Sequence, residues 1–140
     1  MVLRASELTV GDSRDEVVVD NLTRTQIVQY AGASGDFNPL HTDDLYAREV
    51  AGYPGVFAHG MLGMGLLGKA LTSWVGDGRL TSFGVRFRAQ IWPGDTLTAR
   101  LSVSALRTDE GVPYADITAV VVNQDGAEVI AGNATARLDP

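Results

Sequence analysis

The sequence predicts an α+β fold in which an antiparallel sheet packs on one buried helix. Residues 59–75 are almost entirely apolar, which is typical of a helix that is buried on all sides. Beyond Leu80, apolar residues recur at every second position, which is typical of half-buried antiparallel strands. A chain of 140 residues can bury one core, so we expect residues 1–140 to form a single domain.

The first helix is expected to begin after Thr23. Thr23 and Gln26 stand three positions apart and fit a capping box, in which each side chain satisfies the other residue's backbone N–H. Gly35 can end this helix because glycine readily adopts the left-handed conformation of a C-cap. The helix should therefore stop directly before Asp36.

A short second helix is expected over residues 43–50. Thr42 is a candidate N-cap, and Asp43 and Asp44 would stand in the first turn as solvated charges. Gly52 ends the pattern.

The apolar helix contains several glycines, each of which costs a helix about 1 kcal/mol relative to alanine. Residues 63–68 spell G-x-G-x-x-G, but they lie inside the helix and not between a strand and a helix start, so they do not form a phosphate loop. We interpret the glycines as sites of close packing against the sheet. The alternative is that Gly65 or Gly68 leaves room for a bound acyl chain.

Four strands are expected to follow as a meander, with a fifth strand near residues 16–19. The expected ranges are residues 85–91, 97–105, 114–122 and 130–138. The sequence Pro93-Gly-Asp95 predicts a turn after the first of these strands. Residues 123–126 have the composition of a hairpin turn.

The loop that follows the first helix carries the most reactive group of side chains. Asp36, Asn38 and His41 lie within six positions, and Pro39 prevents the helix from continuing. A carboxylate and an imidazole that share one water can move protons near neutral pH. The Gly60 N–H, at the start of the apolar helix, can stabilise a developing negative charge on oxygen. These groups suit the addition of water to an acyl group beside a carbonyl, or its removal.

The residues of this loop resemble one family closely. Asp36-Phe-Asn-Pro-Leu-His41, followed by Ala58-His-Gly-Met61, is similar to the motif of the MaoC-like (R)-specific enoyl-thioester hydratases and dehydratases. The resemblance extends through Val85-Arg-Phe87 and Pro93-Gly-Asp-Thr-Leu97. The segment Thr72-Ser-Trp-Val-Gly-Asp77 also resembles the catalytic subunit of mycobacterial 3-hydroxyacyl-carrier-protein dehydratases. The resemblance implies a hotdog fold, in which the sheet wraps around the central helix and two subunits pair through their sheets.

We expect Asp36 and His41 to be the catalytic pair, with Gly60 as the oxyanion donor. The residues leave open which member of the pair exchanges the proton at C2. Asn38 is expected to support the pair by holding the loop or by orienting His41 through its amide. We interpret His59 mainly as structural.

Composition excludes several other classes of protein. The chain has no cysteine, which excludes a disulfide framework and thiolate chemistry. Its net charge of −6 argues against nucleic acid or an anionic membrane as the main partner. No apolar stretch is long enough for a transmembrane helix, and no signal peptide is recognised, so we expect a cytoplasmic protein. No metal or redox cofactor is implied.

A nucleotide-bearing substrate would need a local basic patch. Arg86 and Arg88 project from one face of an expected strand. Most such pairs are merely solvated; the functional alternative is binding of coenzyme A phosphates or of an acidic carrier protein.

The sequence therefore predicts a hydro-lyase that hydrates trans-2-enoyl thioesters or dehydrates (3R)-hydroxyacyl thioesters, carried on coenzyme A or acyl carrier protein. One alternative is a hotdog acyl thioesterase. Another is a subunit of a heterodimeric dehydratase that depends on a partner chain. We expect a homodimer, with a heterodimer as the alternative.

Overall fold

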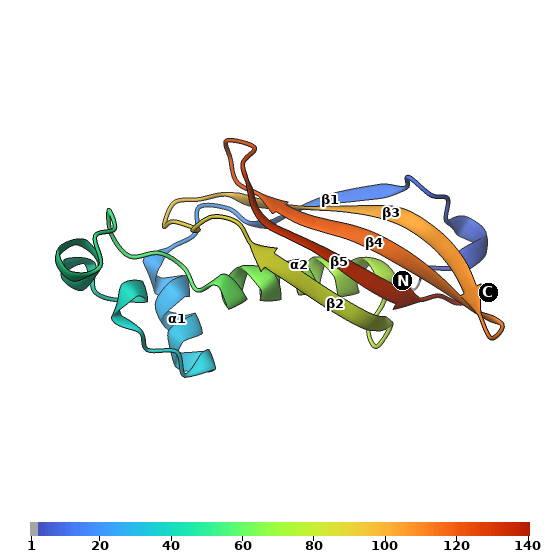
Figure 1. The fold of residues 1–140 in the computed structure, drawn as a ribbon, viewed down its shortest axis with the longest axis horizontal. Helices are drawn as coiled ribbons and strands as arrows, with labels where there is room; N and C mark the ends of the chain where they lie inside the picture. The colour runs from blue at the N-terminus through green and yellow to red at the C-terminus, as the bar shows by residue number, and fades with distance from the viewer. Residues whose placement is uncertain (1–2) are drawn as a thin grey trace.

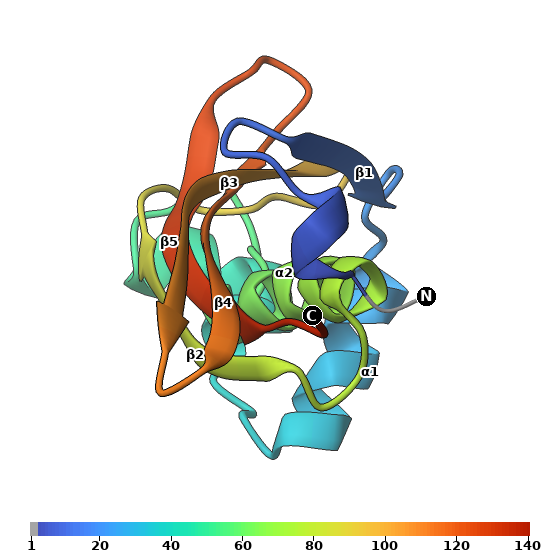
Figure 2. The same cartoon turned by 90° about the vertical axis from the view of Figure 1, so that its right-hand side faces the viewer.

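The computed structural model describes residues 3–140 and consists of one antiparallel sheet curved around a long helix (Figure 1). The strands are β1 (Ser13–Val19), β2 (Leu80–Phe87), β3 (Leu97–Asp109), β4 (Val112–Val122) and β5 (Glu128–Arg137). The helices are α1 (Arg24–Ser34) and α2 (Gly60–Val75), with 3₁₀ turns at Ala5–Glu7 and Pro39–His41 and a π-helical turn at Tyr46–Val50. Viewed along the molecule, α2 lies in the hollow of the sheet (Figure 2). This is the α+β arrangement that the sequence predicts, with the sheet wrapped around the central helix as the family resemblance implies.

The strands follow the order β1-β3-β4-β5-β2, which differs from the predicted meander of four strands. β3, β4 and β5 are consecutive neighbours, as expected, but β2 pairs with β5, where Val85 lies opposite Gly132. β1 takes the position beside β3, which confirms the fifth strand near residues 16–19. The meander was wrong because alternation of apolar residues indicates which face of a strand is buried, but not which strand lies next to it.

β2 ends at Phe87, earlier than the predicted end at residue 91. The N–H groups of Arg88 and Ala89 both donate to the carbonyl oxygen of Val129, at 2.8 and 3.4 Å, which interrupts the regular ladder with β5. Ile91 still reaches the core and is only 3% exposed. The apolar alternation therefore continues past the end of the strand.

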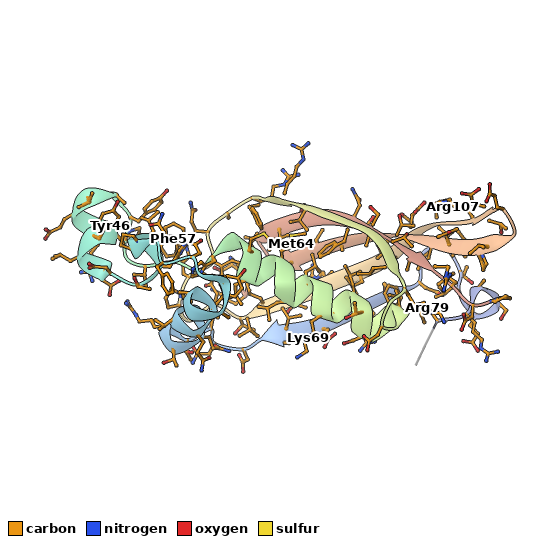
Figure 3. All side chains as sticks on the ribbon, turned by 90° about the horizontal axis from the view of Figure 1, so that it is seen from below. Tyr46, Phe57, Met64, Lys69, Arg79 and Arg107 are labelled. Carbon is orange, nitrogen blue, oxygen red and sulfur yellow. The ribbon has the colours of Figure 1, made fainter. Side chains whose placement is uncertain are left out.

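α2 is buried on one side only, not on all sides as predicted. Leu67, Leu71 and Val75 are fully buried beneath the sheet. An exposed stripe follows every fourth position of the helix: Met61, Gly65, Lys69 and Ser73. Figure 3 shows α2 from below, with the strands behind it. Neither α2 nor any other helix within residues 3–140 is long and apolar enough to cross a membrane.

Close packing explains two of the glycines in α2. A Cβ on Gly63 would lie 2.6 Å from Ile130 Cδ1, and a Cβ on Gly68 would lie 3.3 Å from the ring of Phe83. Gly65 differs, because nothing lies within 4 Å of the position that its Cβ would take. Gly65 therefore belongs to the exposed stripe.

The start and the end of α1 have the predicted geometry. The Thr23 N–H donates to Gln26 Oε1 at 2.9 Å, and the Gln26 N–H donates to Thr23 Oγ1 at 3.1 Å, which completes the capping box. Gly35 ends the helix with φ at 75°, in the left-handed region. Both predictions are confirmed, and Asp36 is the first residue beyond the cap.

The predicted helix over residues 43–50 is confirmed apart from its first residue: residues 44 and 45 are α-helical and continue directly into a π-helical turn at Tyr46–Val50. Asp43, and not Thr42, stabilises its start, because Asp43 Oδ1 accepts two backbone hydrogen bonds, at 3.0 and 3.1 Å, from positions 45 and 46. Thr42 lies one residue too early to be the N-cap: it belongs to the preceding turn, where its N–H donates to the Pro39 carbonyl oxygen at 3.2 Å, and Asp43 is the residue directly before the helix.

Candidate active site

The loop after α1 is held by a series of local hydrogen bonds. Asp36 Oδ1 accepts from the Asn38 N–H at 3.2 Å, and Asn38 Oδ1 accepts from the Leu40 N–H at 3.0 Å. These are the turns that Asp and Asn form with the backbone two residues further on. Pro39 then begins the 3₁₀ turn that ends at His41. Asn38 contacts His41 through its backbone carbonyl, at 3.0 Å, so its geometry favours the loop-holding role.

Phe57 determines the orientation of the His41 imidazole. His41 Nδ1 lies 2.6 Å from the backbone carbonyl oxygen of Phe57. Because a carbonyl only accepts, Nδ1 carries the proton, and the lone pair of the neutral ring is on Nε2. The Phe57 ring packs edge-on against the imidazole, with ring centroids 5.3 Å apart. His41 therefore presents Nε2 as a proton acceptor.

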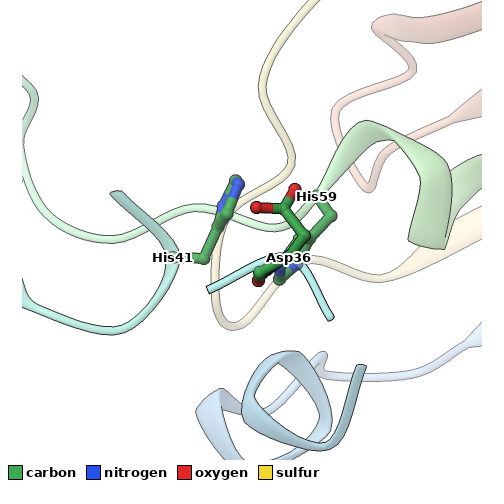
Figure 4. A group of neighbouring side chains, drawn as sticks. All are labelled: Asp36, His41 and His59. Carbon is green, nitrogen blue, oxygen red and sulfur yellow. Dashed lines mark hydrogen bonds between the residues drawn. The ribbon is translucent and has the colours of Figure 1, made fainter. Parts of the chain in front are cut away.

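Asp36 and His41 come together beside a third side chain, that of His59 (Figure 4). One nitrogen or oxygen atom from each of the three residues lies within 4.8 Å of the other two. Asp36 is exposed and His41 is partly buried, whereas His59 is only 2% exposed. A water that forms hydrogen bonds of about 2.8 Å to two atoms can bridge a separation of this size. The geometry is therefore compatible with a carboxylate and an imidazole that share one water.

His59 contacts both of the other residues. Its Nε2 lies 3.0 Å from the backbone carbonyl oxygen of Asp36. Its ring stacks on His41, with centroids 3.7 Å apart and planes inclined by 25°. The hydrogen bond fits the structural role expected from the sequence, but the stacking was not predicted. It depends on how the loop folds back on the start of α2, and residue spacing does not show this.

The three side chains offer a carboxylate and two imidazoles, which is a donor set that transition metals use. The two imidazole rings, however, are stacked and nearly parallel. The lone pair of an imidazole nitrogen lies in the plane of its ring, so the lone pairs of two stacked rings point in parallel directions. They do not converge on a single ion, which would have to lie about 2.0–2.1 Å from each nitrogen. The geometry therefore suits acid–base chemistry better than metal coordination.

Gly60 begins α2 next to these side chains. The N–H of the first helical residue has no acceptor within the helix and lies at the positive end of the helix dipole. A Cβ on Gly60 would lie 3.1 Å from the ring of Phe87, so a larger residue here would require the Phe87 ring to shift by a few tenths of an ångström. One pocket of about 380 Å³ is lined by these residues and their neighbours: Tyr30, Ser34, Asp36, His41, His59, Gly60, Met61 and Phe87. The structure thus places Asp36, His41 and Gly60 around one pocket.

Arg86 and Arg88 lie outside this pocket. Both side chains are exposed, and Arg88 follows the end of β2 and does not lie within the strand as expected. Arg88 lines a neighbouring pocket of about 270 Å³ together with Gly60 and Phe87. Neither arginine forms an ion pair with any of residues 3–140.

Asp44 connects α1 to the segment that orients His41. Its carboxylate pairs with Arg24 of α1 and accepts the Val56 N–H at 3.0 Å. The hydrogen bond from Arg24 lowers the pKa of the Asp44 carboxyl, and the bond from Val56 lowers it further. Asp44 is therefore not only the solvated charge that was expected: it holds the segment in which Phe57 presents its carbonyl to His41.

Residues 6–124 match the family model described as a MaoC-like domain. The chain is 35% identical over 120 residues to 3-hydroxyacyl-thioester dehydratase Y of Mycobacterium tuberculosis, which covers 84% of this chain and 39% of that protein. It is also 35% identical over 118 residues to an (R)-specific enoyl-CoA hydratase of Aeromonas caviae, which covers 81% of this chain and 84% of that protein. The chain thus spans well under half of the mycobacterial relative and most of the Aeromonas relative.

The structure is similar to that of the (R)-hydratase from A. caviae involved in PHA biosynthesis. The TM-score is 0.83 at 31% sequence identity, and the similarity covers 96% of this chain and 99% of that chain. The hydratase motif, the fold around α2 and the family match over residues 6–124 agree with one another. This chain belongs to the MaoC-like domain family.

Proposed function

We propose that the chain is a hydro-lyase that adds water reversibly to trans-2-enoyl thioesters and gives (3R)-hydroxyacyl thioesters. The observation that carries this proposal is the Asp36 carboxylate within 4.8 Å of the His41 imidazole, beside the start of α2 at Gly60. The two relatives are named as a dehydratase and an (R)-specific hydratase, which supports the reaction and its stereochemistry.

In this proposal one water is held between Asp36 and His41. His41 Nε2 can accept a proton from the water because Nδ1 donates to Phe57. Hydration breaks one O–H bond of water and the C2–C3 π bond, and it forms an O–C3 bond and a C2–H bond. The proton that leaves the water reaches C2 through the Asp36–His41 pair. We assign the transfer to the pair because both side chains lie within reach of the same water. Asn38 supports the pair by holding the loop between its members.

The Gly60 N–H is the proposed donor to the thioester carbonyl oxygen. When water attacks C3, negative charge moves onto this oxygen, and an N–H at the positive end of α2 stabilises it. A donor of this kind is typically worth about 3–4 kcal/mol of activation free energy. The thioester itself provides the remaining activation, so the scheme uses no metal or redox cofactor.

Arg86 and Arg88 are the proposed contacts for the carrier. Both are free of ion pairs with the other described residues, and Arg88 lines the pocket that adjoins Gly60. Guanidinium groups bind phosphate with paired hydrogen bonds, and they also attract acidic protein surfaces. The carrier would then be coenzyme A or an acidic acyl carrier protein.

Incubation with crotonyl-CoA tests the reaction. Loss of the ultraviolet absorbance of the enoyl group without release of free thiol, and a product of the (3R) configuration, are the expected results. Release of thiol would identify an acyl thioesterase and contradict the proposal. Failure to convert enoyl thioesters of several chain lengths, on coenzyme A and on carrier protein, would contradict it as well.

We also propose that the chain acts as a homodimer. Two apolar side chains that line the site pocket are largely exposed, Met61 at 54% and Phe87 at 53%. Burial against a second subunit would remove this apolar surface from water. Light scattering on the purified, active chain tests the proposal. A monomer that gains activity only with a different protein would support the heterodimeric alternative.

A further inference from the structure

We propose that His59 is a positioning residue that fixes the placement of Asp36 relative to His41, an inference that rests on the proposed hydration activity. His59 touches both members of the pair, one through a hydrogen bond and the other through ring stacking. It lies at the junction of the loop and α2, directly before Gly60. Three features of its surroundings carry the inference.

The first feature is the hydrogen bond from His59 to the backbone of Asp36. Their atoms Nε2 and O lie 3.0 Å apart, and because a carbonyl only accepts, Nε2 carries the proton. This bond joins two residues that are 23 positions apart in the chain. It holds the first residue of the loop against the start of α2. Asp36 and Gly60, the residue after His59, both line the site pocket.

The second feature is the packing of the His59 ring. One partner is the His41 ring, stacked with centroids 3.7 Å apart. The other partner is Tyr30 of α1, whose ring meets His59 edge-on with centroids 4.8 Å apart. His41 is therefore held at its Nδ1 by the carbonyl of Phe57 and at its face by His59. Rotation of the His41 ring would break one of these two contacts.

The third feature is the other ring nitrogen of His59. Nδ1 is buried and has no hydrogen-bond partner among the residues that the structure describes. A buried polar atom without a partner destabilises a fold, and a phenylalanine would not carry this atom. Stability is therefore a weak reason for an imidazole here. Only an imidazole combines a flat ring for His41 with an N–H for Asp36 at this distance from the backbone.

Two substitutions separate these contacts. His59→Phe keeps a ring that can stack on His41 but removes the donor to Asp36. His59→Gln keeps an N–H donor at a similar reach but removes the ring. Small displacements of reacting groups lower turnover strongly, so we expect each variant to lose roughly 10- to 100-fold in kcat. KM should change by less than about threefold, because neither contact binds substrate.

The measurements separate positioning from folding. The kcat is referred to the folded fraction, determined by circular dichroism and thermal unfolding. His59→Phe should retain the thermal midpoint of the wild type while losing turnover. A residue with a structural role alone would lower the folded fraction and leave kcat per folded molecule unchanged.

An independent readout follows from the two histidines of the chain. Each variant retains only His41, so its imidazole NMR signals are assigned at once. The Nδ1 proton of His41 should be protected from exchange with water in the wild type and in His59→Phe. In His59→Gln it should exchange rapidly, because the ring face has lost its support.

Wild-type kcat in either variant, or a protected His41 Nδ1 proton in His59→Gln, would overturn the inference. The proposed function has a separate test. If the wild type itself fails to hydrate enoyl thioesters, that function is wrong. Rapid exchange in His59→Gln would then still show that His59 positions His41.

Discussion

The backbone carbonyl oxygen of Phe57 lies 2.6 Å from Nδ1 of His41, and this hydrogen bond gives the two nitrogens of the imidazole different roles. Nδ1 anchors the imidazole, which leaves Nε2 as the nitrogen that can accept a proton. The anchor comes from the segment before α2, which Asp44 holds through the Val56 N–H. The proposed acid–base pair is therefore supported both by its own loop, residues 36–41, and by the segment that contains Val56 and Phe57. A change in either segment should alter turnover.

Replacement of either proposed acid–base residue should abolish most activity without unfolding the chain. His41→Gln offers an amide that cannot take up a proton, and Asp36→Asn removes the carboxylate charge. We expect each variant to lose at least about hundredfold in kcat, the usual scale for general acid–base groups. Steady-state kinetics with crotonyl-CoA measures this, and thermal unfolding checks the fold. Near-wild-type turnover in either variant would show that the residue is not part of the pair.

Asp44→Asn should lower turnover although Asp44 does not line the site pocket. The substitution weakens the pairing with Arg24 and so loosens the segment that presents the Phe57 carbonyl. Asp116→Asn is a matched control, because a hydrogen bond from Thr135 likewise lowers the pKa of the Asp116 carboxyl. Kinetics should show reduced kcat for Asp44→Asn and wild-type kcat for the control. Equal kcat values in the two variants would contradict the role of Asp44.

The stability of the same variant should depend on pH. In the folded chain the pKa of Asp44 lies below its ordinary value of 3.8, mainly because of the hydrogen bond from Arg24. The ionised Asp44 carboxylate therefore stabilises the folded chain fully at pH values above 3.8. This stabilisation is lost as the pH falls through the lower pKa of the folded state. Urea unfolding should therefore find Asp44→Asn less stable than the wild type at neutral pH. The difference should shrink below about pH 4, and a constant difference would count against the ion pair.

Gly60→Ala should reduce activity through Phe87. The added Cβ would lie 3.1 Å from the Phe87 ring, so the ring must move, although the N–H at position 60 is retained. Adding Phe87→Ala should restore part of the lost kcat/KM because it removes the clash. Gly65→Ala, on the exposed stripe of the same helix, should keep wild-type kinetics and stabilise the fold by about 1 kcal/mol. No recovery in the double variant would mean that the clash is not the cause.

Replacing Arg86 and Arg88 together by glutamine should raise KM and leave kcat nearly unchanged. The reason is that carrier contacts contribute to substrate binding but not to the chemical step. The pair Arg100→Gln and Arg107→Gln, in β3, removes the same charge and is the control. KM should rise only in the first double variant, and the effect should weaken at high salt. A fall in kcat at unchanged KM would rule out carrier binding.

Local features of the fold could be predicted from the sequence because neighbouring residues determine them. The capping box of Thr23 and Gln26 is one example, because it depends on two side chains within one turn. The stop at Gly35 is another, because it depends on the left-handed backbone conformation that glycine adopts readily. The position of β2 beside β5 could not be predicted in this way, because it depends on how distant segments pair, which a pattern of apolar residues does not encode. The exposed side of α2 did have a signal that was missed, since Lys69 and Ser73 stand four positions apart and follow Gly65 on the same helical stripe.

The same distinction holds at the site. Asp36, Asn38 and His41 could be selected because they share one short loop. The stacking of the His59 ring on His41 and the hydrogen bond from the Val56 N–H to Asp44 each connect two segments that are separate in the sequence. These contacts appear only when α1, the loop and the start of α2 are assembled.

The strand order leaves β1 and β2 as the two outermost strands of the sheet. β1 directs Arg14 toward α2, where its Nη1 donates to the Ser73 carbonyl oxygen at 3.4 Å, and Glu16 has a buried carboxylate oxygen. Inward-pointing charged side chains on an edge strand oppose pairing of that edge with a strand of another chain. β2 instead carries Phe83 and Val85 at the equivalent half-buried positions. Aggregation along β1 is thereby opposed, and any self-association through backbone pairing is directed to β2.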